Sequence, residues 1–366
     1  MALKVGIVGL PNVGKSTLFN AVNQQAQAQA SNYRFCTIDP NVGQVDVPDT
    51  RIDKLAELVS PERVMPTSIE FVDIAGLVKG ASKGEGLGNK FLANIREVDA
   101  ITHVIRCFED ENILREEGVI NPVGDKEIID TELQLKDLES VEKQLERNNK
   151  IAKNGDAKAK ELVAILEKCQ AHLMEGNSIR SMEMEDEEAA VVKEIFLLTS
   201  KPVLYVANVD EKSMLTGNKY SEALKEAVAA EGNEVIVMNN SIEAEISVME
   251  DAEDKAMFLE EYGLTEPGLS RLIRSAYSLL SLITYFTAGE KEVRAWTIHE
   301  GWKAPQAAGV IHTDFEKGFI KAEVIAYDDY VNLGSEASAR EAGKLRIEGK
   351  EYVVDDGDVM HFRFNV

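Results

Sequence analysis

The sequence predicts an α/β protein: a mostly parallel sheet with helices on both sides, an inserted helical arm and a separate C-terminal α+β domain. Three observations carry this prediction. Short apolar runs rich in valine and isoleucine alternate with helical patterns over residues 1–124 and 200–265, which is typical of parallel strands joined by helices. Helical periodicity occupies residues 125–199, and strand-like segments return over residues 283–366.

Five apolar runs are predicted to be strands buried on both faces, because their hydrophobicity is continuous and does not alternate. They are Lys4–Gly9, Ile69–Ala75, Ile101–Phe108, Pro202–Asn208 and Glu234–Met238. The first helical pattern, Gly14–Asn23, follows the first strand directly.

Residues 125–199 interrupt this alternation with two apolar stripes at helical spacing. The stripes contain Leu138, Val141 and Leu145, and then Leu162, Leu166, Cys169 and Leu173. Asn154-Gly155-Asp156 between them is typical of a turn. We interpret the segment as an inserted arm of two antiparallel, coiled-coil-like helices; the alternative is two ordinary helices lying on the sheet.

Residues 266–282 are predicted to form a linking helix, and residues 283–366 a small domain. Three segments of this domain resemble strands, Ala295–Ile298, Phe319–Tyr327 and Val359–Phe364, and one helical stretch, Glu336–Ile347, lies among them. About 80 residues of this kind suffice for an independent α+β domain.

The composition favours a cytoplasmic protein without a membrane partner. No apolar run is long enough to span a bilayer. The apolar N-terminus leads into a glycine-rich turn, whereas a signal peptide ends in a small-residue cleavage site. The three cysteines are far apart and the five histidines lack metal-ligand spacing, so we predict neither a disulfide framework nor a zinc site.

The net charge of −24 disfavours loose binding to nucleic acids, because the protein is repelled from phosphate backbones. We therefore expect no sequence-specific DNA binding. Docking on a particular RNA or ribosomal surface through a local patch remains compatible with this charge.

A phosphate-binding loop follows the first predicted strand, where Gly9–Thr17 matches G-x-x-x-x-G-K-[ST]. The glycines allow backbone N–H groups to turn inward around phosphates, and the next helix presents its positive N-terminus to them. Lys15 offers a positive charge to the β- and γ-phosphates, and the hydroxyl of Ser16 is a ligand for Mg²⁺. The motif predicts a nucleoside triphosphatase with Lys15 in a catalytic role.

Two further segments complete the predicted catalytic site. Asp73 ends an apolar strand, where the metal-site carboxylate of a P-loop enzyme lies, and the backbone N–H of Gly76 would reach the γ-phosphate. The glycine-rich residues 79–88 are unsuited to a stable helix and predict a switch that orders around the γ-phosphate. Thr37, between the phosphate loop and Asp73, is expected to complete the Mg²⁺ shell.

The purine site departs from that of ordinary GTPases, which present Asn-Lys-x-Asp at the corresponding place. This chain has Asn208-Val209-Asp210-Glu211. Glutamate is one methylene longer than aspartate, so the paired acceptance from guanine N1–H and the 2-amino group is misplaced. We expect adenine to be accepted, with Glu211 near the base and a backbone contact from Ser241 after the next strand.

The usual catalytic glutamine is also absent. In Ras-like GTPases it follows the glycine of Asp-x-x-Gly and orients the attacking water, but here the residue is Leu77. We therefore expect slow intrinsic hydrolysis, with water positioned by another group, a partner or an ion.

These motifs resemble those of the YchF/Obg-like ATPase family along essentially the whole chain. The resemblance rests on Gly9–Thr17, Phe35–Asn41, Phe71–Gly88, Asn208–Glu211 and Thr297–Val366. It implies an Obg-type G domain, a helical arm and a C-terminal TGS domain of the β-grasp kind. It also implies a preference for ATP over GTP and association with ribosomes.

The resemblance also assigns individual residues. Nucleotide contacts fall on Asn12, Val13, Gly14, Lys15, Ser16 and Thr17, and on Asn208 with Val209; the Mg²⁺ ligands fall on Ser16 and Thr37. Asn12 resembles the asparagine that holds K⁺ in related NTPases lacking the glutamine. Two departures stand out: Arg115 replaces a histidine frequent in the family, and Arg34 replaces a usual proline.

Several functions fit these residues. The first is a ribosome-associated regulatory ATPase whose nucleotide state controls docking on the translation machinery. A P-loop kinase acting on a small acceptor, a GTPase and a binding-only module are alternatives. For docking, the C-terminal domain offers Lys317, Lys321, Arg340, Lys344 and Arg346, which would either face RNA or form an ordinary solvated surface.

Overall fold

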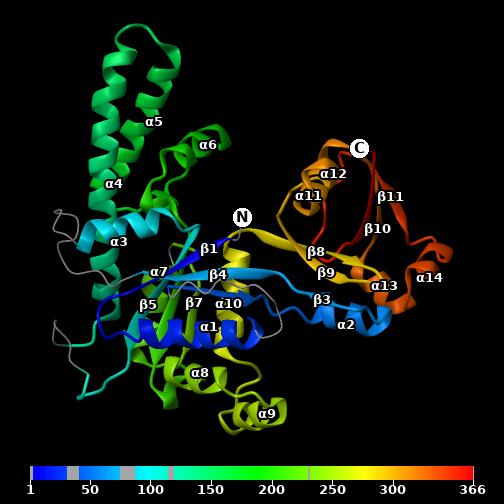
Figure 1. Ribbon diagram of the computed structural model, residues 1–366. Helices are drawn as coiled ribbons and strands as arrows, with labels where there is room; N and C mark the ends of the chain where they lie inside the picture. The colour runs from blue at the N-terminus through cyan, green and yellow to red at the C-terminus, as the bar shows by residue number, and fades with distance from the viewer. Residues whose placement is uncertain (1–2, 31–40, 75–86, 114–118, 230, 366) are drawn as a thin grey trace. The chain divides into compact units, whose positions relative to one another are not determined.

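The computed structural model describes residues 3–30, 41–74, 87–113, 119–229 and 231–365 (Figure 1). The chain divides into two compact units. One contains Met1–Val45 and Glu70–Leu272, and the other contains Asp46–Ile69 and Ile273–Val366. No helix within the described ranges is both long enough and apolar enough to cross a membrane.

The first unit is built on a six-stranded sheet in the order β2-β4-β1-β5-β6-β7. Its strands are β1 Lys4–Val8, β2 Val42–Asp46, β4 Ser68–Asp73, β5 Ala100–Cys107, β6 Val203–Val209 and β7 Val235–Met238. From β4 through β7 every neighbouring pair is parallel. All side chains of β5 and β6 are buried. The α/β prediction and its five strands are therefore confirmed.

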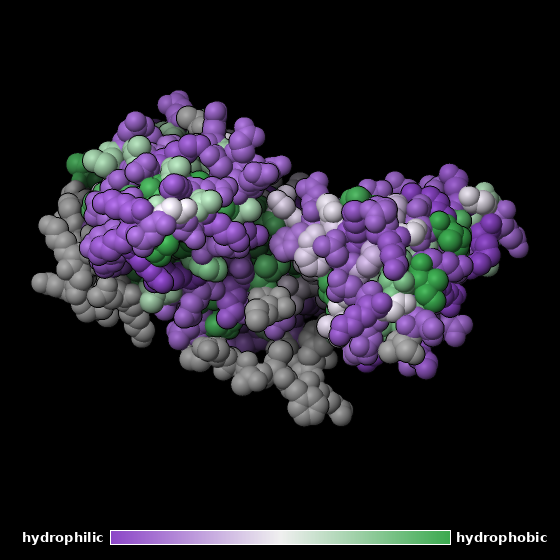
Figure 2. Space-filling view, turned by 90° about the horizontal axis from the view of Figure 1, so that it is seen from above, coloured by the Kyte–Doolittle hydropathy of each residue, from purple (hydrophilic) through white to green (hydrophobic). Residues whose placement is uncertain are grey.

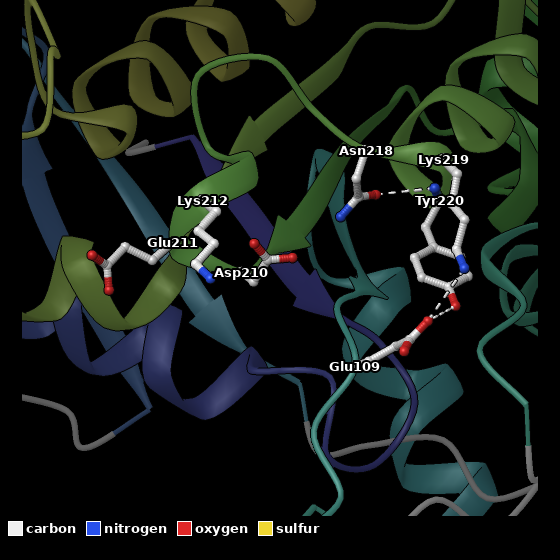
Figure 3. Close-up of a pocket in the computed structure, with 7 residues that line it drawn as sticks. All are labelled: Glu109, Asp210, Glu211, Lys212, Asn218, Lys219 and Tyr220. Atoms are coloured by element: carbon white, nitrogen blue, oxygen red, sulfur yellow. Dashed lines mark hydrogen bonds and ion pairs between the residues drawn. The ribbon is translucent and has the colours of Figure 1, made fainter.

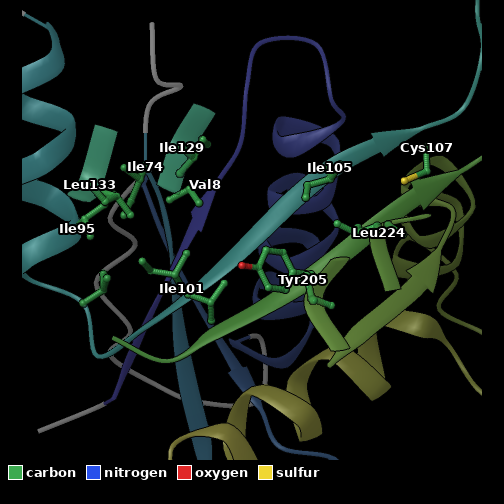
Figure 4. Close-up of a cluster of buried hydrophobic side chains, with 14 of the residues drawn as sticks. Val8, Ile74, Ile95, Ile101, Ile105, Cys107, Ile129, Leu133, Tyr205 and Leu224 are labelled. Carbon is green, nitrogen blue, oxygen red and sulfur yellow. The ribbon is translucent and has the colours of Figure 1, made fainter. Parts of the chain in front are cut away.

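Helices cover this sheet and close its core. They are α1 Lys15–Ala30, α3 Leu87–Arg96, α7 Lys219–Ala229, α8 Asn240–Ser247 and α9 Ala252–Glu261. Helix α1 packs beside α8, and α7 packs beside β6 and β7. Figure 4 shows Val8, Ile101 and Tyr205 of the strands meeting Ile95 of α3 and Leu224 of α7 in one buried cluster.

The arm is a helical hairpin made of α4 Pro122–Ala152 and α5 Ala157–Met174 (Figure 1). The predicted turn lies between them: Gly155 has φ +95°, and the Asp156 side chain accepts a hydrogen bond from Ala159 N at 2.7 Å. The two predicted stripes pack against each other, with Val141 of α4 and Leu166 of α5 fully buried. The shorter helices η2 Ile179–Ser181, α6 Asp186–Ile195 and η3 Leu198–Ser200 complete this region.

A buried charged network joins the base of the arm to the sheet. Lys126 Nζ of α4 lies 2.7 Å from Asp130 Oδ2 and 2.5 Å from Glu231 Oε1, and Arg180 Nη2 lies 3.0 Å from Asp130 Oδ1. His103 of β5, only 2 % exposed, adjoins this network. Burial lowers the pKa of His103 to about 4; Asp130 opposes the shift, while Lys126 and Arg180 add to it. His103 is therefore neutral near pH 7.

The second unit contains another six-stranded sheet, in the order β11-β10-β12-β8-β9-β3. Its strands are β3 Val64–Met65, β8 Leu282–Ala288, β9 Val293–His299, β10 Phe319–Ile325, β11 Arg346–Glu348 and β12 Val359–Phe364. The pairs β8/β9, β10/β11 and β10/β12 are antiparallel, whereas β12/β8 and β3/β9 are parallel. The linking helix is present as α10, Gly268–Leu279.

Residues 46–69 belong to this second unit, although the sequence predicted them to be part of a continuous segment 1–124. Strand β3 pairs with β9, and α2, Thr50–Val59, buries Ile52 and Leu55 beside Phe286 of β8. Arg51 Nη1 also lies 2.7 Å from Asp356 Oδ2. An apolar stripe on a helix shows that it must cover a sheet but not which sheet, so the sequence pattern could not reveal this placement.

The helices of the second unit also differ from the prediction of one helix over Glu336–Ile347. Helix α14 ends at Glu341, Gly343 takes φ +73°, and the chain then enters β11. Three further helices were not predicted: α11 Ala304–Ile311, α12 Thr313–Lys317 and α13 Tyr327–Leu333. They are five to eight residues long, shorter than the window of about 11 or more residues over which helical periodicity can be recognised.

Candidate functional site

The phosphate loop connects β1 to α1 by a tight turn. Asn12 and Gly14 have φ +60° and +93°, and α1 begins at Lys15. A Cβ atom on Gly9 would lie 2.6 Å from Val104 O of β5, so only glycine lets the loop leave the sheet here. The strand–loop–helix context that the motif requires is therefore present, with the N-terminus of α1 available to an anion.

Lys15 and Asp73 interact electrostatically in this loop region, although they are 58 positions apart in the sequence. Asp73 is the last residue of β4 and pairs with Ile7 of β1. Burial lowers the pKa of Lys15 and raises the pKa of Asp73, and each partner's charge opposes the other's shift. Groups whose pKa values are shifted in this way by burial and by a nearby opposite charge cluster at functional sites.

The residues present fit a hydrated Mg²⁺. Asp73 Oδ1 is buried and has no hydrogen-bond partner among the described residues, so it can accept from a donor such as a metal-bound water. Ser16, the second residue of α1, carries an exposed hydroxyl at the start of the helix. Hard oxygen donors of this kind are the ligands that Mg²⁺ prefers.

Two asparagine side chains donate hydrogen bonds to backbone carbonyls of the phosphate loop. Asn208 Nδ2 donates to Val13 O, and Asn240 Nδ2 donates to Gly14 O, each at 3.0 Å. The Asn240 backbone N–H donates to Asn208 Oδ1 at 3.0 Å. The sequence motif predicted Asn208 but not the side chain of Asn240, which no periodicity or motif spacing in the sequence marks.

The other predicted base-site residues lie around the ends of β6 and β7. The side chain of Val209 is buried in the core, and its carbonyl accepts from Asn239 Nδ2 at 2.8 Å. Glu211 is exposed and begins the short helix η4, Glu211–Ser213. Ser241 is exposed in α8, but its backbone N–H donates to Asn239 Oδ1 at 3.0 Å. Any base contact from Val209 must therefore come from its backbone.

An open pocket of about 610 Å³ lies at the carboxyl ends of β5 and β6 (Figure 3). Its lining includes Glu109, Asp210, Glu211 and Tyr220. Tyr220 and Lys219 both contact the Glu109 carboxylate. Ligands of open parallel sheets bind at these strand ends, which agrees with the predicted place of the base.

Several predicted positions lie outside the described residues. They are Arg34, Thr37, Gly76, Leu77 and Arg115, with most of the glycine-rich stretch 79–88. The structure thus brings together Asn12–Thr17, Asp73 and Asn208, and Thr37 and Gly76 stay predictions.

A second contact that the sequence did not predict links helix α8 to the start of helix α10. Glu243 of α8 is 3 % exposed, and its carboxylate accepts from Gly268 N and Leu269 N at 2.8 and 3.0 Å. Burial raises the pKa of Glu243, and the two N–H groups oppose that shift. The carboxylate caps α10 at the end where the helix dipole is positive.

The predicted basic patch of the second unit is largely neutralised. Ion pairs join Lys321 to Glu323, Arg340 to Glu336, Lys344 to Asp329 and Arg346 to Asp358. Figure 2 shows that hydrophilic side chains predominate on the visible surface. These pairs favour the solvated-surface interpretation over a phosphate-binding patch.

Comparisons with known proteins bear on the whole chain. Residues 4–168 match a family described as 50S ribosome-binding GTPase, and residues 282–365 match the YchF-GTPase_C family, described as a protein of unknown function. Proteins named ribosome-binding ATPase YchF from Haemophilus ducreyi and Bacillus subtilis are 58 % and 57 % identical over the full length of both chains.

A comparison with solved structures shows that the fold is shared as well. The YchF GTPase of Schizosaccharomyces pombe superposes with a TM-score of 0.90 and 42 % identity, covering 99 % of this chain and 97 % of that one. Identity at this level over full length, together with a shared fold and a shared C-terminal family, shows common descent. The chain belongs to the YchF family.

Proposed function

We propose that this protein is a cytoplasmic, ribosome-associated ATPase that binds ATP with Mg²⁺ and hydrolyses it to ADP and phosphate. The observation that carries the proposal is the phosphate loop with Lys15 beside Asp73, in a chain whose relatives are named ribosome-binding ATPases. In this proposal the nucleotide state governs docking on the ribosome.

The proposed roles follow from position. Lys15 and the N–H groups of the loop bind the β- and γ-phosphates. Ser16 and Asp73 would hold Mg²⁺, directly or through water, together with Thr37, and Gly76 would donate its N–H to the γ-phosphate. The ion would neutralise charge that develops on the phosphate oxygens.

We infer that adenine is preferred over guanine, because Glu211 and Val209 replace the two residues by which GTPases read guanine. The names of the relatives differ on this point: they include both ATPases and a GTPase. Calorimetric titration of ATP and GTP, with and without ribosomes, tests the preference. ATP should bind at least about tenfold more tightly, a difference of about 1.4 kcal/mol; tighter binding of GTP would refute it.

Turnover is proposed to be slow until something outside the chain completes the site. One candidate is a K⁺ held by Asn12, which is exposed with φ +60° in the loop; the other is the ribosome. ATPase rates in KCl and NaCl at equal ionic strength, each with and without ribosomes, separate them. Stimulation by K⁺ that disappears in Asn12→Ala supports the ion, and fast turnover in NaCl alone contradicts both.

For the domains we propose residues 1–124 and 200–265, apart from 46–69, as the nucleotide-binding domain and residues 125–199 as the arm. Residues 266–282 are the link, and residues 283–366, with 46–69, the docking domain. Because 46–69 pack in the second unit, removing the C-terminus would strip Ile52 and Leu55 of their partners. Docking is therefore tested in the full chain at Lys317, the patch residue that forms no ion pair among the described residues. Lys317→Glu should weaken co-sedimentation with ribosomes, and unchanged co-sedimentation would move the docking surface elsewhere.

A further inference from the structure

The two asparagine contacts beneath the phosphate loop act on successive peptide groups. Asn208 holds the carbonyl of Val13, and Asn240 holds the carbonyl of Gly14. In a trans peptide the C=O and the following N–H point in opposite directions within one plane. Fixing Val13 O therefore fixes the direction of Gly14 N–H, and fixing Gly14 O fixes the direction of Lys15 N–H. Both N–H groups then face away from the asparagines, toward the side of the loop where phosphates bind.

The orientation of the Asn240 amide follows from its surroundings. Gly14 O can only accept, so the NH₂ group must face it. Gly14 O also accepts Leu18 N at 3.0 Å in the first turn of α1, so both of its lone pairs are engaged. Asn240 is 1 % exposed, and its Oδ1 has no partner among the described residues.

This unpartnered oxygen argues against a space-filling role for Asn240. An apolar side chain would fill the same space without burying an unsatisfied acceptor. The only hydrogen bond that the described structure gives the Asn240 side chain is the one to Gly14 O. The backbone N–H of Asn240 also donates to Asn208 Oδ1. We call the two side-chain hydrogen bonds, Asn208 to Val13 O and Asn240 to Gly14 O, the asparagine clamp.

We propose that the side chain of Asn240 is a positioning group for phosphate binding, which orients the Gly14–Lys15 peptide through its hydrogen bond to Gly14 O. It contacts no phosphate itself. Because the clamp acts on the loop and not on the base, it should serve ATP and GTP alike. The inference rests on the proposed nucleotide site.

The test uses the full-length protein and calorimetric affinities for Mg-ATP and Mg-GTP. Asn240→Ala should weaken both by about tenfold, the effect of one lost hydrogen bond, and leave the ATP:GTP ratio unchanged. Affinities within twofold of wild type overturn the inference. A selective loss of ATP also overturns it, because that result would make Asn240 a base-reading residue.

A second variant supplies a readout that a merely structural role would not move. Asn240→Asp keeps the size of the side chain but places an oxygen against Gly14 O at neutral pH. When protonated, the new carboxyl has an O–H that can donate to Gly14 O. ATP affinity relative to wild type should therefore recover as the pH falls from about 8 to about 5.5, the range in which a buried carboxyl takes up its proton. A flat pH profile equal to that of Asn240→Ala contradicts the clamp.

Two control variants distinguish a general loss of stability, a failure of the Asn240 inference and a failure of the proposed nucleotide site. Thr199→Val removes a buried hydroxyl bonded to Asp137 at the base of the arm, so it should lower the melting temperature without changing ATP affinity. Lys15→Ala tests the proposed site itself. Loss of binding in Lys15→Ala with wild-type binding in Asn240→Ala overturns this inference alone, whereas wild-type binding in Lys15→Ala overturns both.

Discussion

The replacement of Gly14 by alanine offers a sharp test of the loop geometry. Gly14 has φ +93°, and an added Cβ would lie 2.3 Å from Asn208 Nδ2 and 3.2 Å from Asn240 Nδ2. Two costs follow. The backbone conformation costs a residue with a Cβ on the order of 1–3 kcal/mol. The clash must also displace Asn208 and break its hydrogen bond to Val13 O, worth about 1 kcal/mol.

Together these costs amount to roughly 2–4 kcal/mol, or about 30- to 1,000-fold in ATP affinity if the variant must regain the native loop to bind. Calorimetry on the full-length variant measures this directly. Gly155→Ala is a matched control, because Gly155 has φ +95° but no atom within 4 Å of the added Cβ. It should lose stability through strain and keep its ATP affinity. ATP binding by Gly14→Ala within threefold of wild type would refute the reasoning.

Two further predictions concern contacts that the sequence did not reveal. The folded-state pKa of His103, about 4, lies below the ordinary 6.5, so the stability tied to its neutral form is complete above about pH 6.5 and is lost as the pH falls toward 4. His103→Gln should remove up to about 3 kcal/mol of this pH dependence of the free energy of unfolding. Urea midpoints of the variant that vary with pH as in wild type would contradict the prediction. Glu243→Ala should free the first N–H groups of α10 and cost about 1–3 kcal/mol, seen as faster hydrogen exchange from Gly268 onward, whereas the exposed Glu245→Ala should change nothing there.

The strands and the phosphate loop were predictable because their signals are local. Continuous hydrophobicity marked β5 and β6, and the arm followed from two stripes interrupted at Gly155. The placement of residues 46–69 was not predictable, because an apolar stripe does not name its partner sheet.

The side-chain network of the site was equally hidden. The side chain of Asn240 donates one hydrogen bond to Gly14 O, and the carboxylate of Glu243 accepts two from Gly268 N and Leu269 N. These partners are distant in the sequence, and neither spacing nor composition encodes such contacts. The length of α14 was overestimated because the break at Gly343 depends on one backbone angle, which a helical-looking stretch does not exclude.

The pairing of β3 with β9 has a consequence for the order in which the chain acquires its structure during synthesis. Met65 and Val293 are separated by about 230 residues, which take roughly 10 to 50 s to translate at 5–20 residues per second. Throughout that interval Ile52 and Leu55 of α2 lack the strands β8 and β9 that will cover them. The second unit can therefore complete its fold only after nearly the whole protein has been made. Until then residues 46–69 lack the strands against which their apolar side chains pack.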